Sequence, residues 1–356
     1  MAHFNTNSNS RRPLAITLGD PSGIGPEIIV KAFRDAPELT AGCFVAGDVP
    51  ALRRAAEIIQ GPGGVPMPVV VIESMAEAGQ VPPHCIPVLQ VVNSVPLAPI
   101  GQVSEAGGKM AGDCVFWAAR AALRGEVAAV VTAPLHKEAL SAAGEPYSNF
   151  PGHTELLQAE AATHLCKPLD EVPVRMMLAN DELRTVLVSI HVSLREAIER
   201  VTIRNILQTL RITHESVGRA LQRSPRIGVA GLNPHAGEGG LFGREEIEII
   251  APAVAAARAE GIDAHGPFAP DTVFMRARST PGRAGEFDVV VAMYHDQGLI
   301  PVKYLGVEQG VNVTLGLPFV RTSPDHGTAF DIAGTGQADA SSLLAAIRMA
   351  RNLAPQ

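Results

Sequence analysis

The stretch PLAITLGDPSGIGPEIIVKAF, residues 13–33, contains the pattern that decides the fold. An apolar run from Leu14 to Leu18 leads into a glycine-rich loop, and Pro26 precedes the helical pattern from Glu27 to Phe33. Proline suits the first turn of a helix, and a continuous apolar run is typical of a strand that is covered on both faces. The stretch therefore predicts a strand, a tight loop and a helix in succession.

The same alternation continues along the chain. Further strands are predicted at Cys43–Ala46, Val69–Ile72, Val127–Val131, Met176–Leu178, Val186–Ile190, Arg226–Ala230 and Val289–Met293. Further helices are predicted at Met110–Leu123, Thr154–Leu165, Ile203–Leu221, Arg244–Glu260 and Ser341–Asn352. Strands that alternate with helices indicate an α/β fold built on a mostly parallel sheet.

The 356 residues exceed the size at which a single core stops growing, so two lobes are expected. We expect residues 1–12 to form a disordered tail and residues 13–356 to form one intertwined two-lobed catalytic unit. The middle of the chain would make one lobe and both ends the other. The stretches Val81–Pro99 and Gly101–Gly112 are expected to carry chain crossings between the lobes.

Composition narrows the class of protein. Apolar residues make up 46% of the chain, which excludes disorder throughout, and the net charge of −7 disfavours a nucleic-acid partner. The four cysteines form no C-x-x-C pair, so free thiols in a reducing compartment are expected. Because the chain also has no apolar run of about 18 residues, we expect a cytoplasmic protein without a membrane partner.

Histidines are concentrated where predicted strands end. Six of them lie among Gly, Pro, Asp or Thr in or just after such runs: His136, His153, His191, His235, His295 and His326. Ligand sites in α/β sheets lie outside the carboxyl ends of strands, and imidazole is a common ligand of divalent transition metals. Three or more converging rings would form a metal site, whereas each ring taken alone would only bond a turn.

Charged residues accompany these histidines. Asp296 follows His295, and Asp271 lies in the sequence GPFAPDT; either could orient an imidazole, transfer protons or cap a turn. Lys303 and Arg321 lie in apolar surroundings, where an unpaired charge is costly, so a carboxylate or a phosphate is expected beside each. The loop Leu18–Glu27 is not a G-x-G-x-x-G sequence, so any dinucleotide binds without that fingerprint.

Taken together, LGDPSGIGPE, TAPLHK, GHTE, LNPHAGEGG, YHDQGL and GVNVTLGLPFVRTSPDHGTAFDIAG resemble the 4-hydroxythreonine-4-phosphate dehydrogenase family. The resemblance extends from about residue 13 to residue 350. It implies the isocitrate and isopropylmalate dehydrogenase-like fold, which has no Rossmann fingerprint. It also implies a homodimer whose active site is shared between the subunits.

The resemblance also assigns roles to residues of this sequence. It implies metal ligation by His191, His235 and His295, with His295 supplied by the other subunit. The substrate would be held by His153, Thr154, Lys303, Asn312 and Arg321. The dinucleotide site would be lined by the segment Leu315–Ala329, including Leu315, Gly316, Pro318, Asp325, His326 and Gly327. Protons would be handled by Lys303, Asp271 or Asp296, and the sequence does not choose among them.

The activity implied is the NAD- or NADP-linked oxidation and decarboxylation of 4-phosphohydroxy-L-threonine to 3-amino-2-oxopropyl phosphate, in pyridoxal phosphate synthesis. A divalent Zn, Mg, Co or Ni ion would lower the pKa of the substrate hydroxyl. Relatives that act on 4-phospho-threonate or 4-phospho-erythronate are one alternative. The retained GHTE favours a phosphorylated substrate, and all of these acids are phosphorylated. A histidine–metal hydrolase, and a non-catalytic or group-transferring relative, are the alternatives of another class.

Overall fold

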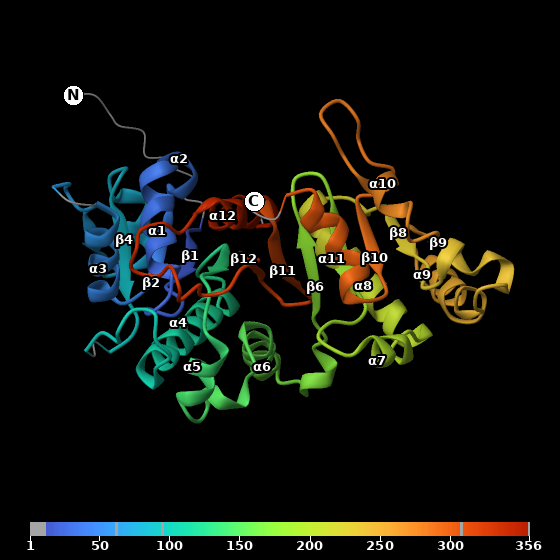
Figure 1. Ribbon diagram of the computed structural model, residues 1–356, viewed down its shortest axis with the longest axis horizontal. Coiled ribbons are helices and arrows are strands. Elements are labelled where there is room, and N and C mark those ends of the chain that lie inside the picture. The colour runs from blue at the N-terminus through green and yellow to red at the C-terminus, as the bar shows by residue number, and fades with distance from the viewer. Residues whose placement is uncertain (1–11, 61–62, 94–95, 307–308, 355–356) are drawn as a thin grey trace.

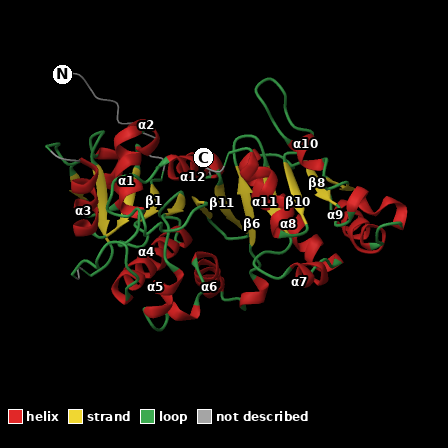
Figure 2. Cartoon of the chain, viewed as in Figure 1, coloured by secondary structure: helices red, strands yellow, loops and turns green. Residues whose placement is uncertain are grey.

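The computed structural model describes residues 12–60, 63–93, 96–306, 309–354, so the expected tail lies almost wholly outside the described residues. A single twelve-stranded sheet runs the length of the molecule, in the order β3-β4-β2-β1-β5-β12-β11-β6-β7-β10-β8-β9. Helices pack against both faces of this sheet (Figure 1, Figure 2). The α/β class and the mostly parallel sheet predicted from the sequence are confirmed.

The strands of one half come from the two ends of the chain. They are β1 (Leu14–Thr17), β2 (Cys43–Gly47), β3 (Val69–Val71), β4 (Ile86–Gln90), β5 (Ala129–Thr132) and β12 (Val320–Pro324). β1 pairs in parallel with β2 and β5, and β5 pairs in parallel with β12. All four residues of β1 are buried, which explains its continuous apolar run.

The other half comes mainly from the middle of the chain. Its strands are β6 (Arg175–Ala179), β7 (Arg184–Leu187), β8 (Ile227–Ala230), β9 (Ala264–Phe268) and β10 (Val289–Ala292). Strand β11 (Val311–Leu315) is antiparallel to β12 and to β6, and β6 is antiparallel to β7. Because three antiparallel pairings separate β12 from β7, the parallel strands of the two halves run in opposite directions.

The helices cover this sheet and connect its strands. They are α1 (Gly25–Asp35), α2 (Pro37–Thr40), α3 (Val49–Gln60), α4 (Glu105–Leu123), α5 (Lys137–Ala142), α6 (His153–Leu165), α7 (Leu194–Glu199), α8 (Ile203–Leu221), α9 (Ala251–Ala259), α10 (Val273–Ala277), α11 (His295–Tyr304) and α12 (Ser341–Leu353). The hydroxyls of Ser104 and Thr202 accept backbone hydrogen bonds at the starts of α4 and α8. No described helix has the length and apolar character that crossing a membrane requires.

Three predicted segments differ from the structure. The stretch Val81–Pro99 contains β4, and Gly101–Gly112 contains the start of α4, so neither is simply a crossing segment. The predicted helix Arg244–Glu260 divides into a π-helix, Glu246–Ile250, and α9. Pro252 lies at the start of α9, where its missing N–H is tolerated.

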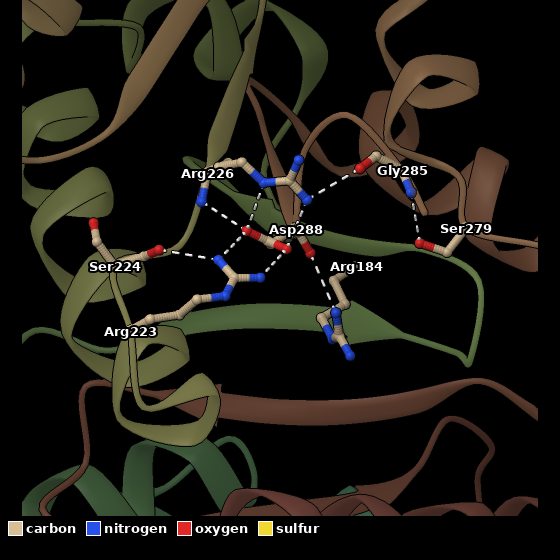
Figure 3. Close-up of polar contacts among 7 residues, drawn as sticks. All are labelled: Arg184, Arg223, Ser224, Arg226, Ser279, Gly285 and Asp288. Atoms are coloured by element: carbon tan, nitrogen blue, oxygen red, sulfur yellow. Dashed lines mark hydrogen bonds and ion pairs between the residues drawn. The ribbon is translucent and has the colours of Figure 1, made fainter. Parts of the chain in front are cut away.

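A cluster of charges fixes the amino-terminal ends of three strands in the second half (Figure 3). Asp288, just before β10, accepts hydrogen bonds of 2.7 and 2.8 Å from the guanidinium of Arg223 and of 2.8 Å from the backbone N–H of Arg226. Arg184, the first residue of β7, donates to the carbonyl oxygen of Asp288 at 3.3 Å. The cluster therefore holds the starts of β7, β8 and β10 together.

Candidate active site

The opposite ends of these three strands carry the histidines predicted to bind a metal. His191 follows β7, His295 follows β10 and His235 follows β8. Strand β10 pairs in parallel with both β7 and β8, so the three loops leave the same edge of the sheet side by side. This is the edge at which α/β proteins place their ligands.

Side-chain hydrogen bonds tie the three loops together. The hydroxyl of Ser189, beside His191, donates to the carbonyl oxygen of Met293 at 3.1 Å. The amide of Gln297, on the helix that His295 begins, donates to the carbonyl oxygen of Gly231 at 2.7 Å. The loop after β10 is therefore fixed to both of its neighbours.

His191 and His295 form a pair within one chain. Their ring centres lie 5.8 Å apart, beside a cavity of about 270 Å³ that both residues line. Two imidazoles on one tetrahedral zinc, with Zn–N bonds of about 2.1 Å, would place their centres about 5 Å apart. Nδ1 of His295 lies 2.6 Å from Oδ1 of Asp296. The other ring nitrogen, Nε2, is therefore the atom that could bind a metal ion.

The charge state of His191 also suits a metal ligand. Burial, followed by the positive charge of Lys137, lowers the pKa of His191 below its usual value. A lowered pKa keeps the imidazole neutral at neutral pH, and only the neutral ring binds a metal. The pair His191–His295 therefore fits a divalent ion.

His235 does not complete this pair within the single chain. Among the described residues, no three His, Cys, Asp or Glu side chains lie close enough together to hold a metal ion. The ring of His235 instead lies 6.3 Å from the ring of Phe242, measured between ring centres. The expectation that a second subunit contributes a ligand, named above as His295, stays a prediction because one chain is described.

A buried cation, Arg321, lines a larger cavity of about 550 Å³. Arg321 is only 3% exposed, and its guanidinium donates to the hydroxyl of Thr132 at 2.6 and 3.1 Å and to that of Thr314 at 3.1 Å. Burial lowers the pKa of Arg321 to about 10, although Glu155 acts in the opposite direction. Because both hydrogen-bond partners are neutral, the positive charge remains available to an anion.

The GHTE sequence forms the wall next to this guanidinium. His153 and Thr154 begin α6, and both line the cavity together with Asn312 from β11. Burial, and then the charge of Arg321, holds the pKa of His153 well below its usual value, and its Nε2 atom is buried without a hydrogen-bond partner. A neutral ring and a helix N-terminus beside a buried arginine form a site for an anion. His191 also lines this cavity.

Lys303 reaches the rim of this cavity from the other half of the sheet. Its Nζ atom lies 2.8 Å from Oδ2 of Asp325, which follows β12 and lines the cavity. Lys303 lies in the last turn of α11, the helix that begins at His295, so one helix connects the two parts of the site. The carboxylate expected beside Lys303 is thus Asp325.

The predicted dinucleotide residues fall into two separate groups. Asp325, His326 and Gly327 line the large cavity, whereas Leu315 and Gly316 line a different cavity, of about 30 Å³, and Pro318 is exposed. The segment is a β-hairpin, and the residues of its tip lie at the end of β12 opposite Asp325. The single dinucleotide site implied along Leu315–Ala329 stays a prediction; within one chain, its residues line two cavities.

The candidate acid–base residues also separate. Asp296 lines the cavity beside His191, but Asp271 is exposed in the loop after the edge strand β9 and lines neither site cavity. His136 stacks on Phe330 with ring centres 4.6 Å apart, while its neighbour Lys137 lines the cavity. Sequence reasoning missed Lys137 and Thr132, although both belong to the quoted TAPLHK region.

Known proteins are similar to this chain in sequence and in fold. Residues 40–350 match the family described as pyridoxal phosphate biosynthetic protein PdxA. A 4-hydroxythreonine-4-phosphate dehydrogenase from Beijerinckia indica is 52% identical over 342 residues, which cover 96% of this chain and 95% of that protein. A D-threonate 4-phosphate dehydrogenase from Salmonella typhimurium is 45% identical over 345 residues, covering 96% and 99%.

A crystal structure of 4-hydroxythreonine-4-phosphate dehydrogenase from Klebsiella pneumoniae superimposes with a TM-score of 0.84 at 42% identity, covering 97% of this chain and 100% of that one. These relatives define the class: the chain is an oxidoreductase of the dehydrogenase type, and that class implies a nicotinamide cofactor. Within that class, the chain belongs to the PdxA family. The family resemblance inferred from the sequence is confirmed.

Proposed function

We propose that this protein oxidises and decarboxylates 4-phosphohydroxy-L-threonine to 3-amino-2-oxopropyl phosphate, in pyridoxal phosphate synthesis. The observation that carries the proposal is the buried guanidinium of Arg321, which has only neutral hydrogen-bond partners in a cavity of about 550 Å³ that extends to His191. A phosphorylated substrate would supply an anionic hydrogen-bond partner for this guanidinium. Its reacting carbon would then lie toward the histidine end of the cavity.

The phosphate would be bound by Arg321, the start of α6 at His153 and Thr154, and Asn312. The neutral ring of His153 donates or accepts one hydrogen bond without adding a charge. Lys303, held by Asp325, would approach the substrate from the rim and exchange a proton at Nζ. Asp296 would orient His295 through Nδ1.

The residues proposed to hold the divalent ion, whether Zn, Mg, Co or Ni, are His191, His235 and His295. Such an ion would act as a Lewis acid on the substrate hydroxyl. We propose NAD or NADP as the hydride acceptor, bound along Asp325, His326 and Gly327. These three residues support this placement because they line the same cavity as Arg321.

We propose that the active form is a cytoplasmic homodimer. Large apolar side chains are exposed on segments next to the histidine loops, including Leu194 at 60% and Leu241 at 73%. Apolar surface of this kind favours coverage by another subunit, and a second copy could complete the metal ligands. The four free cysteines agree with a reducing compartment.

A second candidate substrate is D-threonate 4-phosphate. The relative from Salmonella typhimurium bears that name at 45% identity, and the same phosphate site would serve both acids. Family membership favours the oxidation of one of these two acids. It disfavours a histidine–metal hydrolase, and it also disfavours a group-transferring protein.

The experiment is a substrate panel. The purified protein, NAD or NADP and a divalent ion are mixed with phosphorylated hydroxythreonine, threonate or erythronate, and reduced cofactor is followed by absorbance. The highest kcat/KM is expected with 4-phosphohydroxy-L-threonine. A higher value with threonate 4-phosphate would select the second candidate, and hydrolysis without cofactor reduction would reject both.

A further inference from the structure

The loop that carries His235 has an unusual backbone. Five successive residues, from His235 to Gly239, have positive φ angles of 52°, 52°, 79°, 43° and 64°. Three of them, His235, Ala236 and Glu238, are not glycine. L-residues avoid this left-handed region because Cβ approaches the following carbonyl oxygen, so the surroundings must impose the conformation.

A buried carboxylate lies directly beneath this loop. Glu246 is 2% exposed, and its Oε1 atom accepts hydrogen bonds of 2.7 Å from the backbone N–H groups of both Leu232 and Asn233. Its Oε2 atom accepts a hydrogen bond of 3.0 Å from the side-chain amide of Asn233. One side chain therefore satisfies donors from the residues that immediately precede the left-handed turn.

Two glycines allow this close approach. A Cβ added to Gly231 would lie 3.1 Å from Oε1 of Glu246, and one added to Gly237 would lie 2.7 Å from Oε2. The loop thus closes over the carboxylate from both sides of His235. Glu246 itself begins the π-helix that continues into α9, and the last residue of that π-helix, Ile250, is fully buried. The carboxylate is consequently fixed to the core of the second half.

We propose that Glu246 is a positioning residue for His235. Its carboxylate binds the residues that precede the left-handed turn and packs against Gly237 inside it, and the turn fixes the direction in which the imidazole leaves the backbone. Glu246 does not touch the metal, the substrate or the cofactor. The inference rests on the proposed function, because His235 is taken as a metal ligand.

The test compares Glu246→Gln with the wild-type protein. An amide in this place would turn an N–H group toward one of three donors, so the loop would lose part of its anchor. We expect Co²⁺ affinity, measured by calorimetry on metal-free protein, to fall roughly ten- to a hundredfold, as it does when groups that orient ligands are altered. The visible absorption of the Co²⁺-loaded protein should change as well, since it reports ligand geometry.

Two controls separate positioning from general damage. Glu248→Gln changes a carboxylate on the same helix that is 57% exposed and pairs with Arg244, so its Co²⁺ affinity should equal that of the wild type. Inorganic phosphate, which we expect at Arg321, should bind Glu246→Gln with unchanged affinity. Loss of phosphate binding together with metal binding would show a global defect and overturn the positioning role.

The outcomes are distinguishable. A folded Glu246→Gln protein with wild-type Co²⁺ affinity and absorption would overturn the inference while leaving the proposed function intact. If Glu246→Gln does not fold, Gly237→Ala is measured instead, because its Cβ would displace Oε2; unchanged Co²⁺ binding by that variant would also overturn the inference. If the wild-type protein binds no Co²⁺, the metal role fails first and the inference falls with it.

Discussion

The ammonium group of Lys303 lies 2.8 Å from the carboxylate of Asp325, and this contact joins the end of α11 to the end of β12. The Asp325 side chain is 13% exposed and that of Lys303 40%, so the pair lies at the boundary between protein and solvent. Since α11 begins at His295, the contact fixes the far end of the helix whose first residue belongs to the proposed metal site. This ion pair therefore connects the two halves of the sheet next to the site.

Asp325→Asn tests the importance of this contact. The substitution removes the charge that holds Lys303, and charge-assisted hydrogen bonds contribute about 1.5 kcal/mol at the lower end. We expect kcat/KM for the phosphorylated substrate to fall roughly tenfold, with partial recovery in Asp325→Glu. Steady-state kinetics provide the measurement. Wild-type kcat/KM in Asp325→Asn would show that Lys303 needs no such partner.

Arg321 should report anion binding without any turnover. Ligands that bind only the folded protein stabilise it by about 2.7 kcal/mol at a hundred times their Kd. Inorganic phosphate should therefore raise the Tm of the wild-type protein, while Arg321→Met, which removes the buried charge, should show little increase. Sodium chloride at equal ionic strength is the control. Equal increases of Tm in the two proteins would show that phosphate does not bind at Arg321.

His153 should make stability depend on pH. Its pKa in the folded protein is well below the ordinary value of 6.5. At pH values between the folded-state pKa and 6.5, the unfolded chain therefore binds more protons than the folded protein. Stability should thus decline as pH falls below about 6.5, by at most about 1.4 kcal/mol per pH unit. Denaturant unfolding of His153→Gln should show a flatter profile between pH 7 and 5, whereas His164→Gln, at an exposed position, should follow the wild type. Parallel profiles for His153→Gln and the wild type would contradict a buried neutral ring.

Asp288 should make the stability of the protein depend on pH in the acid range, because its pKa is lowered in the folded protein. Burial acts to raise the pKa of Asp288, but hydrogen bonds from Arg223 and Arg226 outweigh it and hold the pKa far below its usual value (Figure 3). The stabilisation is therefore present above about pH 4 and is lost as pH falls further toward the folded-state pKa.

Asp288→Asn should lower the free energy of unfolding by roughly 2 kcal/mol at pH 7, and by less at pH 3. Urea unfolding at both pH values gives the difference. Asp181→Asn is the control, because that carboxylate is 72% exposed and pairs with Arg348 at 4.0 Å. A deficit in Asp288→Asn that stays constant with pH would show that packing, not charge, is what the residue supplies.

The regular parts of the fold followed from the sequence because their apolar runs are buried on both faces. β10, with the sequence VVVA, is one such strand. Four strands were missed, β4, β9, β11 and β12: Pro87 lies inside β4, Pro267 inside the edge strand β9 and Pro324 at the end of β12, whereas β11 contains no proline. Proline lacks the N–H that a central strand needs, so the local pattern argued against a strand at β9, which its place at the edge of the sheet permits.

The candidate site could be predicted from the sequence only in part, because some of its contacts join residues that are far apart in the chain. Arg321 was expected to meet an anion because it lies in an apolar run, and its burial agrees with that argument. Its support by Thr132 could not be predicted, because the contact depends on β5 lying beside β12, 189 residues away in sequence. Likewise, proximity in sequence suggested that Leu315 and Asp325 share a site, whereas the hairpin between them places them at opposite ends of β12.

The central claim is that a phosphorylated hydroxy acid is oxidised at this site. The most direct test mixes the wild-type protein, a divalent ion and NAD or NADP with 4-phosphohydroxy-L-threonine and follows the absorbance of the reduced nicotinamide. We predict a steady absorbance increase that needs the phosphate group and disappears in His191→Asn. No reduction of either cofactor with this substrate, or with the phosphorylated threonate and erythronate, would contradict the account.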